Sequence, residues 1–159
     1  MNRFKGYIFI FDHDGTLVDT SRVERPVFPK IKEILKLLQK NGNPVYVWTA
    51  RDRYSLTKIL QENKIYHYFE DFSCLEDGPK PFIGGIKKVL GSDLSKIVMI
   101  GDSPSDMKGG AKLGAHCIGV DWTSGDESVK LELKKYGAHK VFSQQAQLLD
   151  YLETGETDV

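Results

Sequence analysis

Short apolar runs alternate with amphipathic stretches along most of the chain. Each of the clearest apolar runs ends at an acidic residue, a threonine or a glycine. This alternation is typical of a parallel sheet whose strands are joined by crossover helices. The clearest predicted strands are Tyr7–Phe11, Val45–Trp48, Ile97–Ile100 and Cys117–Val120, and two shorter ones are predicted at Tyr68–Phe72 and Lys140–Phe142.

The stretch Lys30–Lys40 gives the strongest helix prediction. It places Ile31, Ile34, Leu35 and Leu38 on one face and ends just before Gly42, which suits a left-handed helix cap. Further helices are predicted at Tyr54–Asn63, Pro81–Leu90, Pro104–Leu113, Glu127–Tyr136 and Gln144–Leu152. We therefore predict an α/β fold with a doubly wound, mostly parallel sheet of about five strands and helices on both faces.

Length and composition narrow the class of protein. A chain of 159 residues suits one domain, for which we expect residues 1–153, with residues 154–159 as a frayed tail. The 22 basic and 22 acidic residues cancel, so no overall field attracts nucleic acid or a membrane surface. Cys74 and Cys117 lack the spacing of a disulfide framework or zinc site, which favours a reducing, cytoplasmic location. No apolar stretch approaches the length that spans a bilayer.

Acidic and hydroxyl side chains directly follow three predicted strands. Because ligands of an open parallel sheet bind at the carboxyl ends of its strands, these residues are candidates for a site. The segments are Asp12-His13-Asp14-Gly15-Thr16, Thr49-Ala50-Arg51, and Gly101-Asp102 with Asp106 four residues later. The sequence thus predicts four carboxylates and a hydroxyl at one edge of the sheet.

The carboxylates indicate a metal site. Asp12 and Asp14 are two residues apart, so in extended chain both should face one small volume. Adding Asp102 and Asp106 concentrates negative charge that a cation must offset. All-oxygen ligands suit a hard ion, and few carboxylates together with a phosphate suit Mg²⁺ better than Ca²⁺.

These residues resemble the haloacid dehalogenase superfamily of phosphotransferases. Its four motifs occur in order as Asp12-His13-Asp14-Gly15-Thr16, Thr49, Lys80 and Gly101-Asp102 through Asp106, and the match covers nearly the whole chain. The resemblance implies a three-layer, Rossmann-like fold and a Mg²⁺-dependent phosphatase that forms an aspartyl-phosphate.

The resemblance also implies a role for each residue. Asp12 would be the nucleophile and Asp14 the general acid and base. Asp12, Asp102 and the backbone carbonyl of Asp14 would hold the metal, and Asp106 would support them through water or Lys80. Phosphate or substrate contacts are expected from Thr49, Ala50, Arg51 and Lys80, the last held between Pro79 and Pro81.

Spacing leaves no room for a cap domain, which many members insert after the first motif or between the second and third. Asp12 and Thr49 are 37 positions apart, Thr49 and Lys80 only 31, and predicted helices and strands fill most of both. The segment Val18–Pro29 then resembles the short flap of capless members. An open site needs a neighbouring subunit or a large substrate to exclude water, which leaves phosphoproteins, nucleic-acid ends or small phosphates bound within an oligomer.

Several residues have plain structural explanations as well. Asp106 could simply cap a helix. His13 should point to the opposite side of the strand from the two Asp residues, which favours packing or a contact that supports the site over a catalytic role. Arg51 could contact a substrate anion or form a surface salt bridge. Trp122 could stack on a substrate or be partly buried at the sheet edge. The pairs Lys87-Lys88 and Lys134-Lys135 suit solvated helix faces, so we predict no nucleic-acid site.

Other functions fit the residues less well. A phosphomutase would need a cap, a dehalogenase would not need Asp14, and a signalling receiver domain has a different motif order. A non-catalytic binding protein with the same fold is the rival from another class. We expect a phosphorylated substrate of unknown identity and no membrane partner, while the choice between monomer and homo-oligomer stays open.

Overall fold

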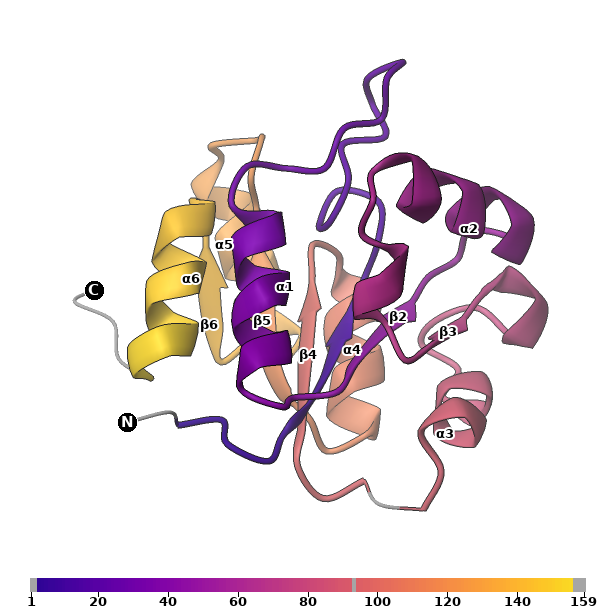
Figure 1. The fold of residues 1–159 in the computed structure, drawn as a ribbon. Helices are drawn as coiled ribbons and strands as arrows, with labels where there is room; N and C mark the ends of the chain where they lie inside the picture. Colours follow the sequence, from indigo (N-terminus) through magenta and orange to yellow (C-terminus); the bar gives the residue numbers. More distant parts are fainter. Residues whose placement is uncertain (1–2, 93, 156–159) are drawn as a thin grey trace.

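The computed structural model describes residues 3–92 and 94–155 and contains a six-stranded sheet in the order β3-β2-β1-β4-β5-β6 (Figure 1). All five strand pairs are parallel. The strands are β1 (Ile8–Phe11), β2 (Val45–Trp48), β3 (Asp71–Ser73), β4 (Ile97–Gly101), β5 (His116–Val120) and β6 (Lys140–Phe142). The predicted parallel α/β fold is confirmed, and both weaker strand regions join the sheet.

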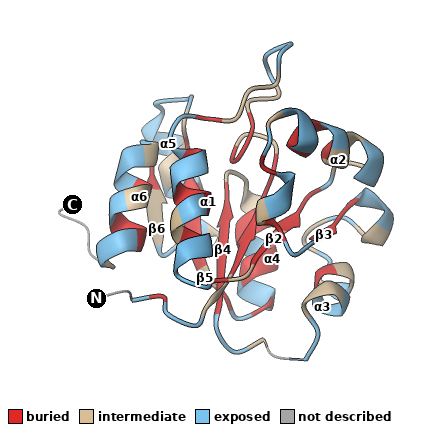
Figure 2. Cartoon of the chain, viewed as in Figure 1, coloured by how far each residue is buried: buried red, intermediate tan, exposed pale blue. Residues whose placement is uncertain are grey.

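Helices cover both faces of this sheet, as predicted. They are α1 (Ile31–Lys40), α2 (Arg53–Glu62), α3 (Gly84–Leu90), α4 (Pro104–Lys112), α5 (Glu127–Lys135) and α6 (Gln145–Thr154), with 3₁₀ turns at Tyr66–Tyr68 and Leu75–Asp77. Buried residues of α1, α2 and α6 form one hydrophobic cluster, and those of α3, α4 and α5 form another. Figure 2 shows the buried residues concentrated on the central strands between these two layers. None of the described helices combines the length and hydropathy needed to cross a membrane.

Helix α1 follows directly from its sequence pattern. Its buried residues are the predicted Ile31, Ile34, Leu35 and Leu38. Gly42 has a φ of 73°, so the chain leaves the helix through the left-handed region that glycine adopts without strain. The sequence therefore specifies both the inner face and the end of this helix.

Two predicted elements are shifted. The strand predicted at Tyr68–Phe72 begins later, at Asp71, because Tyr66–Tyr68 forms a 3₁₀ turn in which the amide of Tyr68 donates to the carbonyl of Ile65. The helix predicted from Pro81 begins at Gly84, because the amide of Phe82 closes a turn on the carbonyl of Pro79.

The predicted tail also begins too early. The structure continues α6 through Thr154, whose hydroxyl donates to the carbonyl of Asp150, one turn back along the helix. The rest of the predicted tail from residue 156 lies outside the described residues.

The order in which the chain visits the strands determines where a ligand site is expected. From β1 the chain runs outward to β2 and β3, then returns to β4 on the other side of β1 and continues to β5 and β6. The connections therefore reverse direction between β1 and β4, which is where open α/β sheets bind their ligands.

Two histidines stack on each other where β5 and β6 begin, at the opposite edge of the sheet from the predicted site residues. His116 stacks on His139 with ring centroids 4.5 Å apart and contacts the ring of Phe4. Its Nε2 lies 3.3 Å from the hydroxyl of Tyr151. Burial, followed by the neighbouring His139 and Arg3, lowers the pKa of His116 from 6.5 to about 4.

The lowered pKa of His116 predicts that the protein loses stability in mild acid. The folded protein binds a proton at His116 less readily than the unfolded chain, so stability is full above pH 6.5 and falls as the pH drops toward 4. We expect His116→Gln to flatten this part of the profile of unfolding free energy against pH, measured by urea denaturation. The exposed His67 provides a control, and His67→Gln should keep the wild-type slope. Parallel losses in wild type and His116→Gln would contradict the assignment.

Candidate active site

Three strand ends bring the predicted residues together. The amide of Asp12 donates to the carbonyl of Ile100 at 2.9 Å, which ties the end of β1 to β4. The amide of Thr49 donates to the carbonyl of Ser73 at 2.9 Å, so the end of β2 is fixed by β3. Asp12, Thr49 and the segment after β4 therefore meet at the carboxyl edge of the sheet, as predicted.

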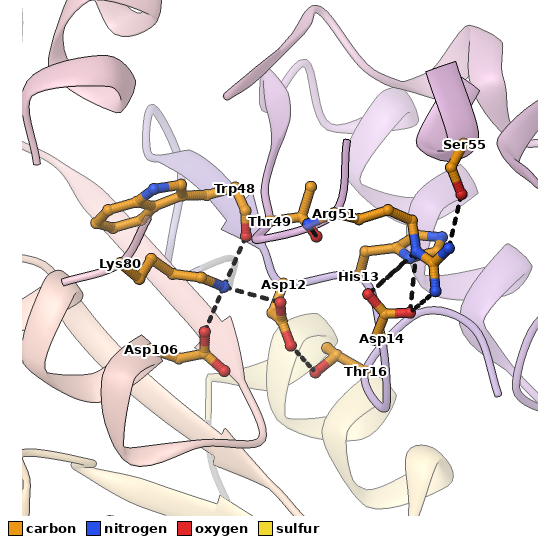
Figure 3. A network of polar contacts seen from close by, with 10 residues as sticks. All are labelled: Asp12, His13, Asp14, Thr16, Trp48, Thr49, Arg51, Ser55, Lys80 and Asp106. Carbon is orange, nitrogen blue, oxygen red and sulfur yellow. Dashed lines mark hydrogen bonds and ion pairs between the residues drawn. The ribbon is translucent and has the colours of Figure 1, made fainter. Parts of the chain in front are cut away.

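Lys80 joins these strand ends through its ammonium group (Figure 3). Its Nζ donates to Oδ1 of Asp12 at 2.8 Å, to Oδ1 of Asp106 at 2.5 Å and to the carbonyl of Trp48 at 2.8 Å. The side chain is only 6% exposed. Burial favours the neutral amine, but Asp12 and Asp106 outweigh it and raise the pKa of Lys80 above its ordinary value.

The carboxylates of Asp12, Asp102 and Asp106 form a cluster in which one oxygen from each lies within 4.8 Å of the others. Burial is the main cause that raises the pKa of Asp12 to about 6, opposed by Lys80 and reinforced by Asp102. Burial, then Asp12, likewise raises the pKa of Asp106 to about 6. Burial also raises the pKa of Asp102. One ammonium group thus does not compensate the charge of this cluster.

The donor set fits a divalent hard cation. With Asp14 the site holds four carboxylates, and Lys80 and Arg51 supply two positive charges, so two negative charges remain for a cation such as Mg²⁺. Asp106 accepts a hydrogen bond on each oxygen, one from Lys80 and the other from the amide of Ser103 at 3.0 Å. Asp12 is bound by Lys80 on Oδ1 only, and its Oδ2 has a single long contact of 3.5 Å, to the hydroxyl of Thr16. Asp12 and Asp102 are therefore the carboxylates better placed to bind a metal.

Asp106 combines the two roles considered for it. It is the third residue of α4 and forms a capping box with Ser103, whose hydroxyl accepts from the amide of Asp106 at 3.3 Å. The cap fixes the carboxylate, and the same carboxylate holds Lys80. The same side chain thus caps α4 and holds Lys80 in the site.

Gly15 allows the loop after β1 to approach Asp102 closely. Its φ of 79° lies in the left-handed region, and a Cβ atom at this position would overlap the Asp102 carboxylate. Glycine is therefore favoured by the backbone conformation, and its lack of a side chain leaves the space that the Asp102 carboxylate occupies. This close approach brings the first and last motifs together.

The expectation that Asp12 and Asp14 face one small volume was wrong. Among the described residues, the Asp14 carboxylate does not join the acidic cluster but turns to Arg51. The i, i+2 rule holds only for extended chain, and β1 ends at Phe11. The amides of residues 16, 17 and 18 all donate to the carbonyl of His13, so the chain turns from Asp14 onward, directly after the two residues that follow β1. A backbone contact from Asp14 to a metal does not depend on this side chain.

Arg51 and Asp14 form a forked ion pair (Figure 3). Nη2 of Arg51 donates to Oδ1 of Asp14 at 2.7 Å, and Nε lies 3.2 Å and 3.3 Å from the two carboxylate oxygens. Nδ1 of the fully buried His13 is 3.6 Å from Oδ2. Burial alone would raise the pKa of Asp14, but His13 and Arg51 hold it well below the usual range.

Sequence reasoning missed Ser55, gave Thr16 no role of its own and left two alternatives for Trp122. Ser55 on α2 accepts from Nη1 of Arg51 at 2.6 Å, and the hydroxyl of Thr16 lies 3.5 Å from Oδ2 of Asp12. Trp122 donates from Nε1 to the carbonyl of Thr16 at 3.0 Å, which supports its burial at the sheet edge over substrate stacking. Thr16 belongs to the first motif, whereas Ser55 carries no motif signal. Ala50 is exposed beside the buried Thr49.

Comparisons with known proteins agree with this fold. A family model described as haloacid dehalogenase-like hydrolase matches residues 23–120. This chain belongs to the haloacid dehalogenase-like hydrolase family. The matched range contains Thr49, Lys80, Asp102 and Asp106, and the Asp12 motif lies just before it.

Curated relatives share part of their length with the chain. It is 25% identical over 121 residues to the pyrophosphatase PpaX of Bacillus cereus, covering 72% of this chain and 52% of that protein. It is 29% identical over 104 residues to the phosphoglycolate phosphatase of Neisseria meningitidis, covering 62% and 44%. The chain thus spans about half the length of the curated relatives it matches.

Solved structures share the fold. A haloacid dehalogenase-like family hydrolase from Streptococcus pneumoniae has a TM-score of 0.77 at 17% identity, covering 91% of this chain and 97% of that one. A hydrolase from Pseudomonas syringae has a TM-score of 0.75 at 19% identity, covering 92% and 98%. At these identities the likeness establishes the architecture.

The contacts of Lys80 predict a large loss of stability when its charge is removed. Lys80→Met leaves the buried carboxylates of Asp12 and Asp106 without their cation, which should lower the free energy of unfolding by about 3 kcal/mol at neutral pH. Urea denaturation without added metal measures this difference. Lys58→Met on the exposed face of α2 is the control and should change stability by less than about 0.5 kcal/mol. Equal stabilities of the two variants would contradict this description of the site.

Proposed function

We propose that this protein is a Mg²⁺-dependent phosphomonoester hydrolase that forms an aspartyl-phosphate on Asp12. The observation that carries the proposal is the contact of Lys80 with Asp12 inside a cluster of three carboxylates at the switch point of the sheet. Membership of the haloacid dehalogenase-like hydrolase family and the phosphatase names of two relatives support it.

In the first half-reaction the Asp12 carboxylate attacks phosphorus and the bond to the leaving oxygen breaks. Lys80 keeps Asp12 ionised and oriented for this attack, since its own ammonium is already bound to two carboxylates and a carbonyl. Thr49, buried at the end of β2, would line the phosphoryl position. Asp12, Asp102 and the carbonyl of Asp14 would hold Mg²⁺, which supplies positive charge to the phosphoryl oxygens when bound.

Asp14 would give a proton to the leaving oxygen and then take one from the attacking water. Arg51 and His13 hold Asp14 in the ionised form, which is the form needed by the base of the second half-reaction. An anionic phosphate beside Asp14 raises the pKa of this carboxyl group, which favours the protonated form when substrate binds.

The remaining expectations are part of the same proposal. The substrate is a phosphorylated molecule, and the small phosphate compounds in the names of the relatives favour a metabolite over a phosphoprotein or a nucleic-acid end. We propose a single catalytic domain in the cytoplasm, consistent with two free, buried cysteines. A non-catalytic binding protein is the alternative, and the complete set of motif residues disfavours it.

Hydrolysis of an aryl phosphate tests the proposal. We expect turnover of 4-nitrophenyl phosphate with MgCl₂, loss of turnover with EDTA, and a reduction of at least about 1,000-fold in Asp12→Asn because the nucleophile is gone. Release of nitrophenolate measures the rate. Asp150→Asn, which alters an exposed carboxylate on α6, should retain wild-type turnover.

Two outcomes would contradict the proposal. Undiminished hydrolysis by Asp12→Asn would remove Asp12 as the nucleophile. A folded wild-type protein that hydrolyses neither aryl nor alkyl phosphates would favour the non-catalytic alternative.

A further inference from the structure

We propose that Arg51 recognises a second anionic group in the leaving group of the substrate. The substrates would then be phosphomonoesters with a carboxylate or a further phosphoryl group close to the transferred phosphorus. This inference rests on the proposed phosphatase function and assigns its substrate class. It rests on a count of the N–H donors of Lys80 and Arg51 that are not already used in contacts with the protein.

Lys80 has no donor left for a further anion. An ammonium group carries three N–H bonds, and all three are directed at Asp12, Asp106 and the carbonyl of Trp48. With 6% exposure, the group is also closed to solvent. Lys80 therefore serves the nucleophile and cannot select among leaving groups.

Arg51 has donors left. A guanidinium carries five N–H bonds, of which Nε and one on Nη2 are directed at Asp14 and one on Nη1 at Ser55. The described contacts thus leave one N–H on each terminal nitrogen, and these two donors are available to a carboxylate or phosphate. The side chain is 25% exposed, so an incoming anion can reach it.

The guanidinium is also held in place before the substrate arrives. Asp14 binds one side of it and Ser55 accepts at 2.6 Å on another. The backbone amide of Arg51 donates to Oγ1 of Thr49 at 3.0 Å, which fixes the residue next to the phosphoryl position. Because little side-chain freedom remains to be lost, anion binding costs less entropy here than at a mobile arginine.

The partner of Arg51 indicates which part of the substrate it meets. Asp14 is the proposed proton donor to the leaving oxygen, and Nη2 of Arg51 lies 2.7 Å from its Oδ1. The guanidinium must therefore lie on the leaving-group side of phosphorus. A second anionic group a few bonds from the leaving oxygen would reach the guanidinium. An uncharged alkyl leaving group would leave both of its remaining N–H bonds unused.

Matched substrates test this inference. Short alkyl phosphates ending in a carboxylate are compared with the same esters ending in a carboxamide, which has nearly the same shape without the charge. With MgCl₂ present, we expect wild type to favour the carboxylate by about tenfold or more in kcat/KM, as for a charge-assisted, two-bond contact. In Arg51→Met the ratio should fall to about one or below, because Asp14 then repels the carboxylate.

Two further variants separate recognition from general damage. Arg53→Met removes an arginine two positions away that pairs with Asp77 at 2.8 Å, and it should keep the wild-type ratio. Arg51→Lys keeps the charge without the fork, and its ratio should fall between those of wild type and Arg51→Met. Thermal unfolding confirms that each variant is folded.

The outcomes are distinguishable. A wild-type ratio near one overturns the inference and leaves the phosphatase proposal standing, and this result needs no variant. An unchanged ratio in Arg51→Met, with both rates reduced equally, overturns it in favour of Arg51 as a residue that only positions Asp14. Failure of wild type to hydrolyse either ester overturns the phosphatase function and this inference with it.

Discussion

The ammonium of Lys80 is the interaction on which the site depends. It bonds to Asp12 at a sequence separation of 68 residues and to Asp106 at a separation of 26, so it joins the loop before α3 to the end of β1 and to the first turn of α4. Buried carboxylates are costly to desolvate, and a paired cation reduces that cost. The same contact that makes the fold tolerate these charges keeps Asp12 ionised as a nucleophile.

The sheet makes this contact possible. Because β1 lies between β2 and β4 in a parallel sheet, its carboxyl end adjoins theirs, and the side chains that follow each strand converge. Gly15 then admits the Asp102 carboxylate, and the capping box of α4 aims Asp106 at Lys80. The same few residues thus support the fold, cap α4 and form the site. The negative charge of the carboxylates that Lys80 does not compensate fits a metal ion.

The sequence predicted those features that depend on the spacing of apolar residues and on the order of strands and motifs along the chain. The buried face of α1, the clearest strands and the convergence of Asp12, Thr49 and Asp102 follow from apolar spacing and from the ends of parallel strands. Lys80 was expected in the site only from the motif order of the family resemblance. The sequence did not predict the partner of Asp14, because β1 ends at Phe11 and Asp14 begins a turn that closes on the carbonyl of His13, so the alternation of a strand does not set the direction of its side chain. Ser55 was missed although it lies only four residues after Arg51, because no motif marks a serine in the first turn of α2 as the partner of an arginine just before the helix.

The central claim is that phosphate passes through Asp12, and chemical trapping of the intermediate tests it most directly. The wild-type protein is mixed with an aryl phosphate and MgCl₂, quenched during turnover and reduced with borohydride, which converts an aspartyl-phosphate to homoserine. Peptide mass spectrometry then locates the modified residue. The account predicts homoserine at position 12, and only when substrate and metal are both present. Turnover that leaves Asp12 unmodified, or that places the modification on another residue, would contradict it.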